Sequence, residues 1–221
     1  MAQKYFWLLA VSGGLFLWAC KKEVSRESAA PPPVASTCSY APYTAGSTYD
    51  FVNTNSSNPL DSNFFTVTVT GDSTINGLTF RKLSSDTATT YDRCDGNGNY
   101  YQMVKGISFE GYSADSVVTL YLKDNVNAGA SWNDTATVKK GTDEQKVMLT
   151  YTVTQKGGQK TVAGLDFTNV ITVKLSASVK FLGTTIPLGT VATNYYAEGI
   201  GLIEIDQQDD TTRLLKYNIN P

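Results

Sequence analysis

The stretch VMLTYTVT at residues 147–154 shows the pattern that decides the fold. Its apolar and polar side chains alternate with a period of two, and the same alternation appears in FTVTVT at residues 65–70 and in ITVKL at residues 171–175. A period of two in segments rich in Thr, Val and Tyr is typical of strands with one buried and one solvated face. Beyond the first 19 residues, no segment shows a sustained helical stripe. The sequence therefore predicts an all-β domain of antiparallel strands over residues 40–221.

Turn-forming residues separate these strands at short intervals. Asn76-Gly77, Lys156-Gly157-Gly158 and the run DGNG at residues 95–98 are typical of the tight turns in hairpins. We expect about ten to fourteen strands joined as a meander. A closed barrel, a sandwich and a strongly curved open sheet are all compatible with this pattern. Among them we expect a strongly curved antiparallel sheet that forms a half-barrel or a sandwich.

The β domain is predicted to consist of two similar halves. GSTYD at residues 46–50 is similar to GASWN at residues 129–133, and each is followed by an alternating strand. The two strands lead to Gly77-Leu78-Thr79-Phe80 and to Gly164-Leu165-Asp166-Phe167, so the landmarks recur about 85 residues apart. We interpret this as a pseudo-repeat of about residues 43–125 and about residues 126–219.

The first 20 residues form a targeting segment and not part of the fold. Lys4 precedes an apolar run at residues 5–17, which is short for a membrane-spanning helix, so residues 1–19 are predicted to be a secretory signal peptide. Leu17-Trp18-Ala19-Cys20 resembles the lipobox of bacterial lipoprotein precursors, although Trp18 departs from the usual small or aliphatic residue. The resemblance implies that Cys20 becomes the N-terminus, carries fatty acyl chains such as palmitate and anchors the protein to a membrane.

Residues 20–39 are predicted to be a disordered tether between the lipid and the β domain. The segment contains Pro31-Pro32-Pro33 and few apolar side chains, so it cannot bury enough surface to offset the entropy of ordering. Lys21 stands where some lipoproteins retained at the inner membrane carry Asp. We therefore expect a lipoprotein of the bacterial envelope at the outer membrane, with the periplasmic or surface side left open.

Several motifs along residues 43–206 resemble a group of uncharacterised bacterial envelope lipoproteins. They include TVTGDSTING at residues 68–77, VAGLDFTNV at residues 162–170 and YYAEGIGLI at residues 195–203. In this group an aromatic strand near the end runs into Gly-x-Gly-Leu-Ile, which Tyr195 to Ile203 match. Some members are similar to the open half-barrel of lipoprotein carrier proteins, which implies a concave apolar face.

Cys38 and Cys94 are the cysteines left once Cys20 carries lipid. Outside the cytoplasm a disulfide between them would persist, close a loop of about 55 residues and stabilise the fold by about 4 kcal/mol in the chain-entropy account. Two free thiols are the alternative, and the position of Cys38 at the end of the tether favours them slightly.

The residue content argues against most kinds of catalysis. The chain has no histidine, and it lacks the Gly-x-Ser-x-Gly and Gly-x-x-x-x-Gly-Lys motifs of hydrolases and nucleotide-binding proteins. The run DGNGN at residues 95–99 begins like a calcium loop but lacks its later Gly and Glu, so a plain turn is favoured over a metal site. Glu110 and Glu198 are the carboxylates that a hydrolase reading would use. We expect no catalytic residues, no bound metal and no cofactor.

Tyrosines and glycines in the predicted strands have both structural and binding interpretations. Gly199 and Gly201 indicate a bend or close backbone approach, with a ligand against the bare backbone as the alternative. Six strand tyrosines would fill a core or, if they share a concave face, make a binding surface: Tyr91, Tyr100, Tyr101, Tyr112, Tyr121 and Tyr151.

The sequence as a whole predicts a binding or structural protein on a membrane surface, with an apolar small molecule or another envelope protein as partner. A formal net charge of −2 and the lack of a clustered basic face argue against a nucleic-acid partner. A hydrolase of carbohydrate or peptide that uses carboxylates alone is the alternative.

Overall fold

The computed structural model describes residues 38–58, 61–109, 112–181 and 183–221. The predicted signal peptide, Cys20 and residues 20–37 of the predicted tether lie outside these residues. The described residues form strands, and none of them belongs to a helix long and apolar enough to cross a membrane. The strands are β1 (Thr48–Asn55), β2 (Ser62–Ile75), β3 (Leu78–Ser84), β4 (Thr89–Cys94), β5 (Asn99–Phe109), β6 (Tyr112–Lys123), β7 (Ser131–Lys140), β8 (Asp143–Val162), β9 (Leu165–Phe181), β10 (Thr184–Ala197), β11 (Gly201–Asp206) and β12 (Asp210–Asn218).

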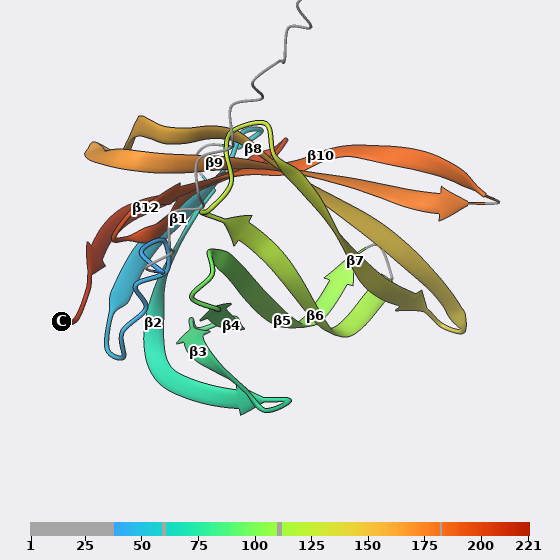
Figure 1. The fold of residues 1–221 in the computed structure, drawn as a ribbon, viewed down its shortest axis with the longest axis horizontal. Coiled ribbons are helices and arrows are strands. Elements are labelled where there is room, and N and C mark those ends of the chain that lie inside the picture. The colour runs from blue at the N-terminus through green and yellow to red at the C-terminus, as the bar shows by residue number, and fades with distance from the viewer. Residues whose placement is uncertain (1–37, 59–60, 110–111, 182) are drawn as a thin grey trace, which may run out of the picture. The chain divides into compact units, whose positions relative to one another are not determined.

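The strands form one closed antiparallel barrel (Figure 1). Each strand pairs with the next along the chain, and β1 also pairs with β12, from Thr48 opposite Asn218 to Asn55 opposite Asp210. The predicted all-β antiparallel fold is thus confirmed, whereas the expected half-barrel or sandwich is wrong. The closing pair joins residues far apart in the chain, such as Asn53 and Thr212, which are 159 positions apart and hydrogen-bond at 3.0 Å. Alternation indicates which face of a strand is buried, but it carries no signal for such a distant pairing.

The seam between β6 and β7 is held differently from the rest of the barrel. Its ladder is reduced to the pair Ser113 and Lys139. Nearer the start of β7, side chains replace the missing backbone bonds: the Leu120 amide donates to Asp134 Oδ2 at 2.8 Å, and the Leu120 carbonyl accepts from Trp132 Nε1 at 2.6 Å. Both backbone polar groups of Leu120 are thereby satisfied by side chains of β7, as buried backbone groups require.

The two stretches that suggested a duplication share a local hydrogen-bond pattern. The Gly46 amide donates to the Val69 carbonyl at 2.8 Å, and the Gly129 amide donates to the Val153 carbonyl at 2.7 Å. The amides of the same two valines donate back, to Ser47 and Ala130, at 2.9 Å in both cases. The turns that follow, at Asn76-Gly77 and Ala163-Gly164, place both of their residues at positive φ. The pseudo-repeat itself remains a prediction.

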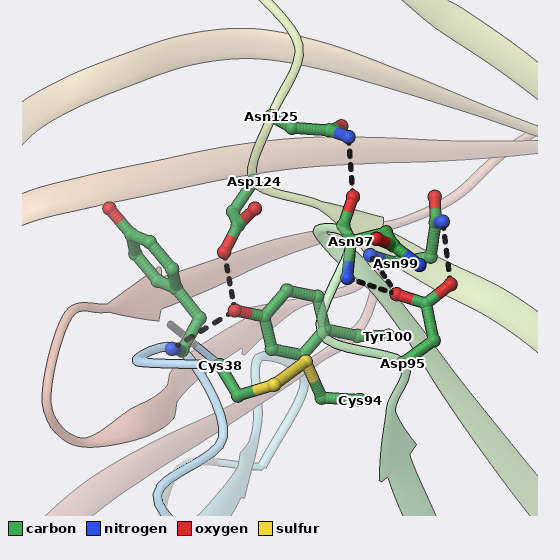
Figure 2. Close-up of a disulfide and its surroundings, with 9 residues drawn as sticks. Cys38, Cys94, Asp95, Asn97, Asn99, Tyr100, Asp124 and Asn125 are labelled. Atoms are coloured by element: carbon green, nitrogen blue, oxygen red, sulfur yellow. Dashed lines mark hydrogen bonds between the residues drawn. A yellow bond between two sulfur atoms is a disulfide. The ribbon is translucent and has the colours of Figure 1, made fainter. Parts of the chain in front are cut away.

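A segment that we call the strap, residues 38–47, connects the tether to β1. Cys38 forms a disulfide with Cys94 at the end of β4, with 5.8 Å between the two Cα atoms (Figure 2). The slight preference for free thiols is therefore wrong in this structure, because Cys38 belongs to the ordered strap and not to the tether. Tyr40 extends this attachment, since its hydroxyl donates to the Asn169 carbonyl at 2.8 Å.

Tyr100 receives the strap inside the barrel. Its hydroxyl donates to Asp124 Oδ2 at 2.5 Å and accepts from the Tyr40 amide at 3.4 Å (Figure 2). Its ring is fully buried in a cluster with Tyr121, Leu122 and Trp132. The strap is thus bound to the β domain by a covalent bond, by hydrogen bonds and by aromatic packing.

Candidate functional site

The barrel interior contains a cavity of about 360 Å³. Its lining comes from strands on all sides of the barrel and from the strap, which contributes Tyr43. One side of the lining is apolar and is formed by Phe51, Phe65, Val67, Leu83 and Ile205. Phe51 and Phe65 stack with ring centroids 5.6 Å apart. Because these positions follow the alternation of β1 and β2, the pattern that builds the barrel also gives the cavity its apolar wall.

The lining along β4, β5 and β6 is polar. Asp92 on β4, Gln102 on β5 and Thr119 on β6 stand directly opposite one another in neighbouring strands, so they share one face of the sheet. Residues in register on neighbouring antiparallel strands have adjacent side chains. The cavity therefore has an apolar side and a polar side, which is the arrangement that suits an amphipathic molecule.

Asp92 is the one carboxylate among the described residues that line this cavity. Its exposed fraction is 2%, and it accepts a hydrogen bond from Gln102 Nε2 at 3.3 Å and a weak one from Thr90 Oγ1 at 3.5 Å. Among the described residues, no lysine or arginine forms an ion pair with it. Burial raises the pKa of Asp92 to about 7, against the opposing effect of hydrogen bonds from Gln102, Tyr121 and Thr90.

Arg81 is the nearest cationic residue by strand register. It stands opposite Asp92 in the pairing of β3 with β4 and opposite Asp72 in the pairing of β2 with β3. The guanidinium forms its ion pair with Asp72, and both of these side chains are nearly half exposed. The hydrogen-bond partners of Asp92 are therefore neutral side chains, such as Gln102 and Thr90.

Five tyrosines also line the cavity: Tyr43, Tyr49, Tyr121, Tyr151 and Tyr196. The rings of Tyr43 and Tyr49 meet edge to face at 5.7 Å, and those of Tyr121 and Tyr196 lie 5.5 Å apart. Burial raises the pKa of the Tyr49 hydroxyl to about 12. Within the described part of the chain, the buried Tyr49 hydroxyl has no hydrogen-bond partner. Such an unpaired polar group is costly unless something else in the cavity satisfies it.

Gly201 makes room for Tyr43 at the start of β11. The glycine has φ of +103°, and a Cβ placed on it would lie 2.9 Å from the Tyr43 hydroxyl oxygen. The ladder between β10 and β11 shifts register nearby, between Tyr195 and Tyr196. Gly199 has φ of +76° and no atom within 4 Å of such a Cβ. Close approach of a side chain to bare backbone therefore explains Gly201, and a turn explains Gly199.

A second cavity of about 440 Å³ lies between the strap and strands β2 to β4. Its lining includes the disulfide and the half-exposed pair of Asp72 and Arg81, so this cavity opens to solvent. Asp92 and Tyr43 line both cavities. These two residues therefore form the boundary between the outer cavity and the barrel interior.

A known structure has this fold. The crystal structure of a "putative lipoprotein" from Parabacteroides distasonis matches with a TM-score of 0.51 at 12% identity, over 83% of this chain and 100% of that chain. A "putative exported protein with YmcC-like fold" from Bacteroides fragilis matches with a TM-score of 0.47 at 10% identity, over 80% of this chain and 97% of that chain. No family model and no curated protein matches the chain. Likeness at 12% identity concerns the fold alone.

The structure describes one of the two carboxylates of the hydrolase alternative. Glu110 lies outside the described residues. Glu198 is exposed, and its carboxylate accepts from Asn169 Nδ2 at 2.8 Å and from Ser39 Oγ at 3.3 Å. Its role here is to hold the start of the strap beside the turn before β11.

The loop that begins like a calcium site is a turn closed by its own amides. Asp95 accepts hydrogen bonds from the Asn97 amide at 2.8 Å, from the Asn99 amide at 3.2 Å and from Asn99 Nδ2 at 2.8 Å (Figure 2). Asn125 Nδ2 donates to the Asn97 carbonyl at 2.6 Å. Within the described residues, no group of three metal-binding side chains is arranged around a common point.

The strand tyrosines divide between the two interpretations. Tyr121 and Tyr151 line the cavity, and Tyr100 lies in the core beside the strap. Tyr91 and Tyr101 are outside the cavity lining, and each has a cation over its ring, Lys105 Nζ at 5.0 Å and Arg93 Cζ at 5.7 Å. The sequence pattern did not indicate that four further residues line the cavity: Asp92, Tyr43, Tyr49 and Tyr196.

Proposed function

We propose that this chain is a lipid-anchored, noncatalytic protein of the bacterial envelope that binds a small amphipathic molecule inside its barrel. The observation that carries the proposal is the interior cavity of about 360 Å³ with an apolar wall on one side and Asp92, Gln102 and Thr119 on the other. Cavities of a few hundred Å³ with apolar walls and few polar groups are typical of small-molecule sites.

Two observations support a location in the bacterial envelope: the lipobox-like N-terminal segment and the disulfide of the strap. The lipobox-like Leu17-Trp18-Ala19-Cys20 follows a signal-type apolar run, and a disulfide between Cys38 and Cys94 fits an oxidising compartment. The "putative lipoprotein" with the same fold is consistent with such a location. Lys21 after the lipidated cysteine favours the outer membrane.

Binding is favoured over hydrolysis by the content of the cavity. Hydrolysis by carboxylates uses a pair of them: two that flank the scissile bond in glycosidases, or two adjacent ones that share a proton in aspartic proteases. The described lining of the interior cavity contains Asp92 and no second carboxylate, and the chain has no histidine to take the other role. A lone carboxyl among tyrosines is suited to orienting a ligand.

The direct test uses the mature chain, residues 20–221, carrying Cys20→Ser behind a cleavable signal peptide so that no lipid is attached. N-phenyl-1-naphthylamine, a neutral apolar dye, is titrated against it, and its fluorescence is expected to rise and saturate at one dye per chain. Thr119→Trp fills the cavity from β6 and should weaken binding by about tenfold or more. Leu175→Phe provides a smaller filling substitution in the same cavity.

The matched control is Val118→Trp, because Val118 is the neighbour of Thr119 on β6 and its side chain is 47% exposed. This variant should bind the dye as the unaltered chain does. The proposal is contradicted if the dye does not saturate, or if the Thr119→Trp and Leu175→Phe variants, shown to be folded by circular dichroism, bind it as tightly as the control.

A further inference from the structure

We infer that the polar side of the barrel cavity binds a positively charged head group, an organic amine or quaternary ammonium, with the carboxylate of Asp92 as its counter-ion. This inference rests on the function proposed above and names the chemical class of the ligand. Three features of the described residues carry it: a buried carboxylate without an ion-pair partner, tyrosine rings that line the same cavity, and an apolar wall in that cavity.

The first feature is the missing counter-charge of Asp92. A carboxylate that is 2% exposed is expensive to ionise unless a cation or several strong donors accompany it. Gln102 and Thr90 donate at 3.3 and 3.5 Å, which are long distances for hydrogen bonds to a charged group, and Tyr121 supplies a third neutral donor. A ligand cation in the cavity would supply the missing charge.

The second feature is the ring of tyrosines. Tyr43 from the strap, Tyr121 from β6 and Tyr196 from β10 line the same cavity as Asp92. The charge of Asp92 adds to the effect of burial in raising the pKa of each of these hydroxyls. Aromatic faces attract cations, and cages of aromatic rings recognise ammonium groups.

Arg81 is the one cation among the described residues that lies near Asp92 by strand register and could serve as its counter-ion in place of a ligand. Gln102 and Thr90 are neutral, and the tyrosines stay protonated because burial raises their pKa values. Arg81 on β3 is the cross-strand neighbour of Asp92, and its guanidinium is engaged by Asp72. The nearest protein cation by strand register is therefore already paired with another carboxylate, which leaves Asp92 without a protein counter-ion among the described residues.

The third feature, the apolar wall, indicates the chemistry of the part of the ligand beyond the charged group. Phe51, Phe65 and Val67 give the same cavity an apolar wall on β1 and β2, so the part of the ligand attached to the cation is apolar. The outer cavity offers a route to the site, because Asp92 and Tyr43 line both cavities. The chemical class that fits is a small amphipathic cation with one charged end.

The experiment compares three probes with the same ten-carbon chain, each used below its micelle-forming concentration: decyltrimethylammonium, decanol and decanoate. Each probe displaces N-phenyl-1-naphthylamine from the mature Cys20→Ser chain at pH 8. We expect decyltrimethylammonium to bind about tenfold or more tightly than decanol, and decanoate to bind least tightly. In the Asp92→Asn variant, the preference for the ammonium over the alcohol should fall to less than about threefold.

Two further variants keep the test decisive. Asp86→Asn removes the same charge from an exposed turn and should keep the full preference. Tyr121→Leu removes one aromatic face beside Asp92 and should lower the preference while Asp92 is intact, which provides an answer if Asp92→Asn does not fold.

The outcomes separate this inference from the proposed function. If all three probes displace the dye equally, or if Asp92→Asn keeps the preference for the ammonium, the cationic head group is refuted while binding in the cavity stands. If a saturable dye signal is absent from the unaltered chain, the proposed function fails and the inference fails with it. Saturable binding with an ammonium preference that depends on Asp92 and not on Asp86 supports both.

Discussion

The hydroxyl of Tyr43 occupies the space in which a side chain on Gly201 would begin. A Cβ at Gly201 would lie 2.9 Å from the Tyr43 hydroxyl oxygen and 3.2 Å from the nearest ring carbon. Tyr43 comes from the strap and lines the barrel cavity, whereas Gly201 opens β11. The glycine therefore couples the position of the strap to the shape of the cavity, since any larger residue would push Tyr43 away from β11.

Gly201→Ala should destabilise the protein more than Gly199→Ala. Both glycines have positive φ, so alanine is strained at both, but only Gly201 has a side chain against the new methyl group. We expect a loss of about 2 to 3 kcal/mol at Gly201 and about 1 kcal/mol at Gly199, measured by urea unfolding. Adding Tyr43→Phe to Gly201→Ala should recover part of the difference. Equal losses at the two glycines would show that Tyr43 does not press on Gly201.

Asp92 should make the folded barrel less stable as pH rises from about 4 to about 7. Burial raises the pKa of Asp92 from 3.8 to about 7, so within this range the folded chain holds a proton that the unfolded chain releases. The free energy of unfolding is highest at the acidic end and falls by roughly 4 kcal/mol until Asp92 is ionised in both states. Because other carboxylates titrate too, the measurement is the difference in urea unfolding between the unaltered chain and Asp92→Asn at each pH. A difference that is constant with pH would mean that the pKa of Asp92 is the same in the folded and the unfolded chain.

The disulfide between Cys38 and Cys94 should stabilise the barrel substantially. It links positions 56 residues apart, and closing a loop of that length restricts the unfolded chain by about 4 kcal/mol in the chain-entropy account. Urea unfolding with and without reductant measures this contribution, and a Cys38→Ser/Cys94→Ser variant serves as the control that reductant leaves unchanged. A loss below about 1 kcal/mol on reduction would indicate that packing of Tyr40 and its hydrogen bonds hold the strap by themselves.

Cys20→Ser should release the protein from membranes. If Cys20 carries the lipid, as its lipobox-like context predicts, the serine variant cannot be acylated at that position and should lose incorporation of labelled palmitate. Cell fractionation should then find the variant produced behind a cleavable signal peptide in the soluble envelope fraction. A serine variant made in this way that stays with the membranes would contradict the anchor.

The alternation of residues 147–154 was sufficient to predict β8 because burial follows it directly. Tyr151 and Val153 are buried, and Thr152 and Thr154 between them are less so. The Gly-containing turns were also readable, since positive φ at Asn76 and Gly77 is a local requirement of the chain. The pairing of β1 with β12 was not readable, because it joins distant segments whose patterns would equally suit an open edge.

The site could be predicted less well than the fold. Asp92 lies between Tyr91 and Arg93, and a carboxylate in such a strand reads as a solvated residue unless the neighbouring strands are known. Gln102 and Thr119 show its true environment, but only through the registers of β4, β5 and β6. Tyr43 belongs to the strap, which has no periodic pattern to show which of its side chains point inward. The one sequence signal for the site was that Asp92, a charged residue, occupies an inward position of β4 in the alternating pattern.

The claim that the barrel holds a small molecule is tested most directly by native mass spectrometry of the full lipidated chain, purified from membranes in mild detergent. Covalent lipid stays with the chain on denaturation, whereas a ligand in the cavity is lost. We predict a native mass larger than the denatured mass by one small molecule, and loss of this excess in Thr119→Trp. Identical native and denatured masses in preparations that have kept their fold would contradict the account.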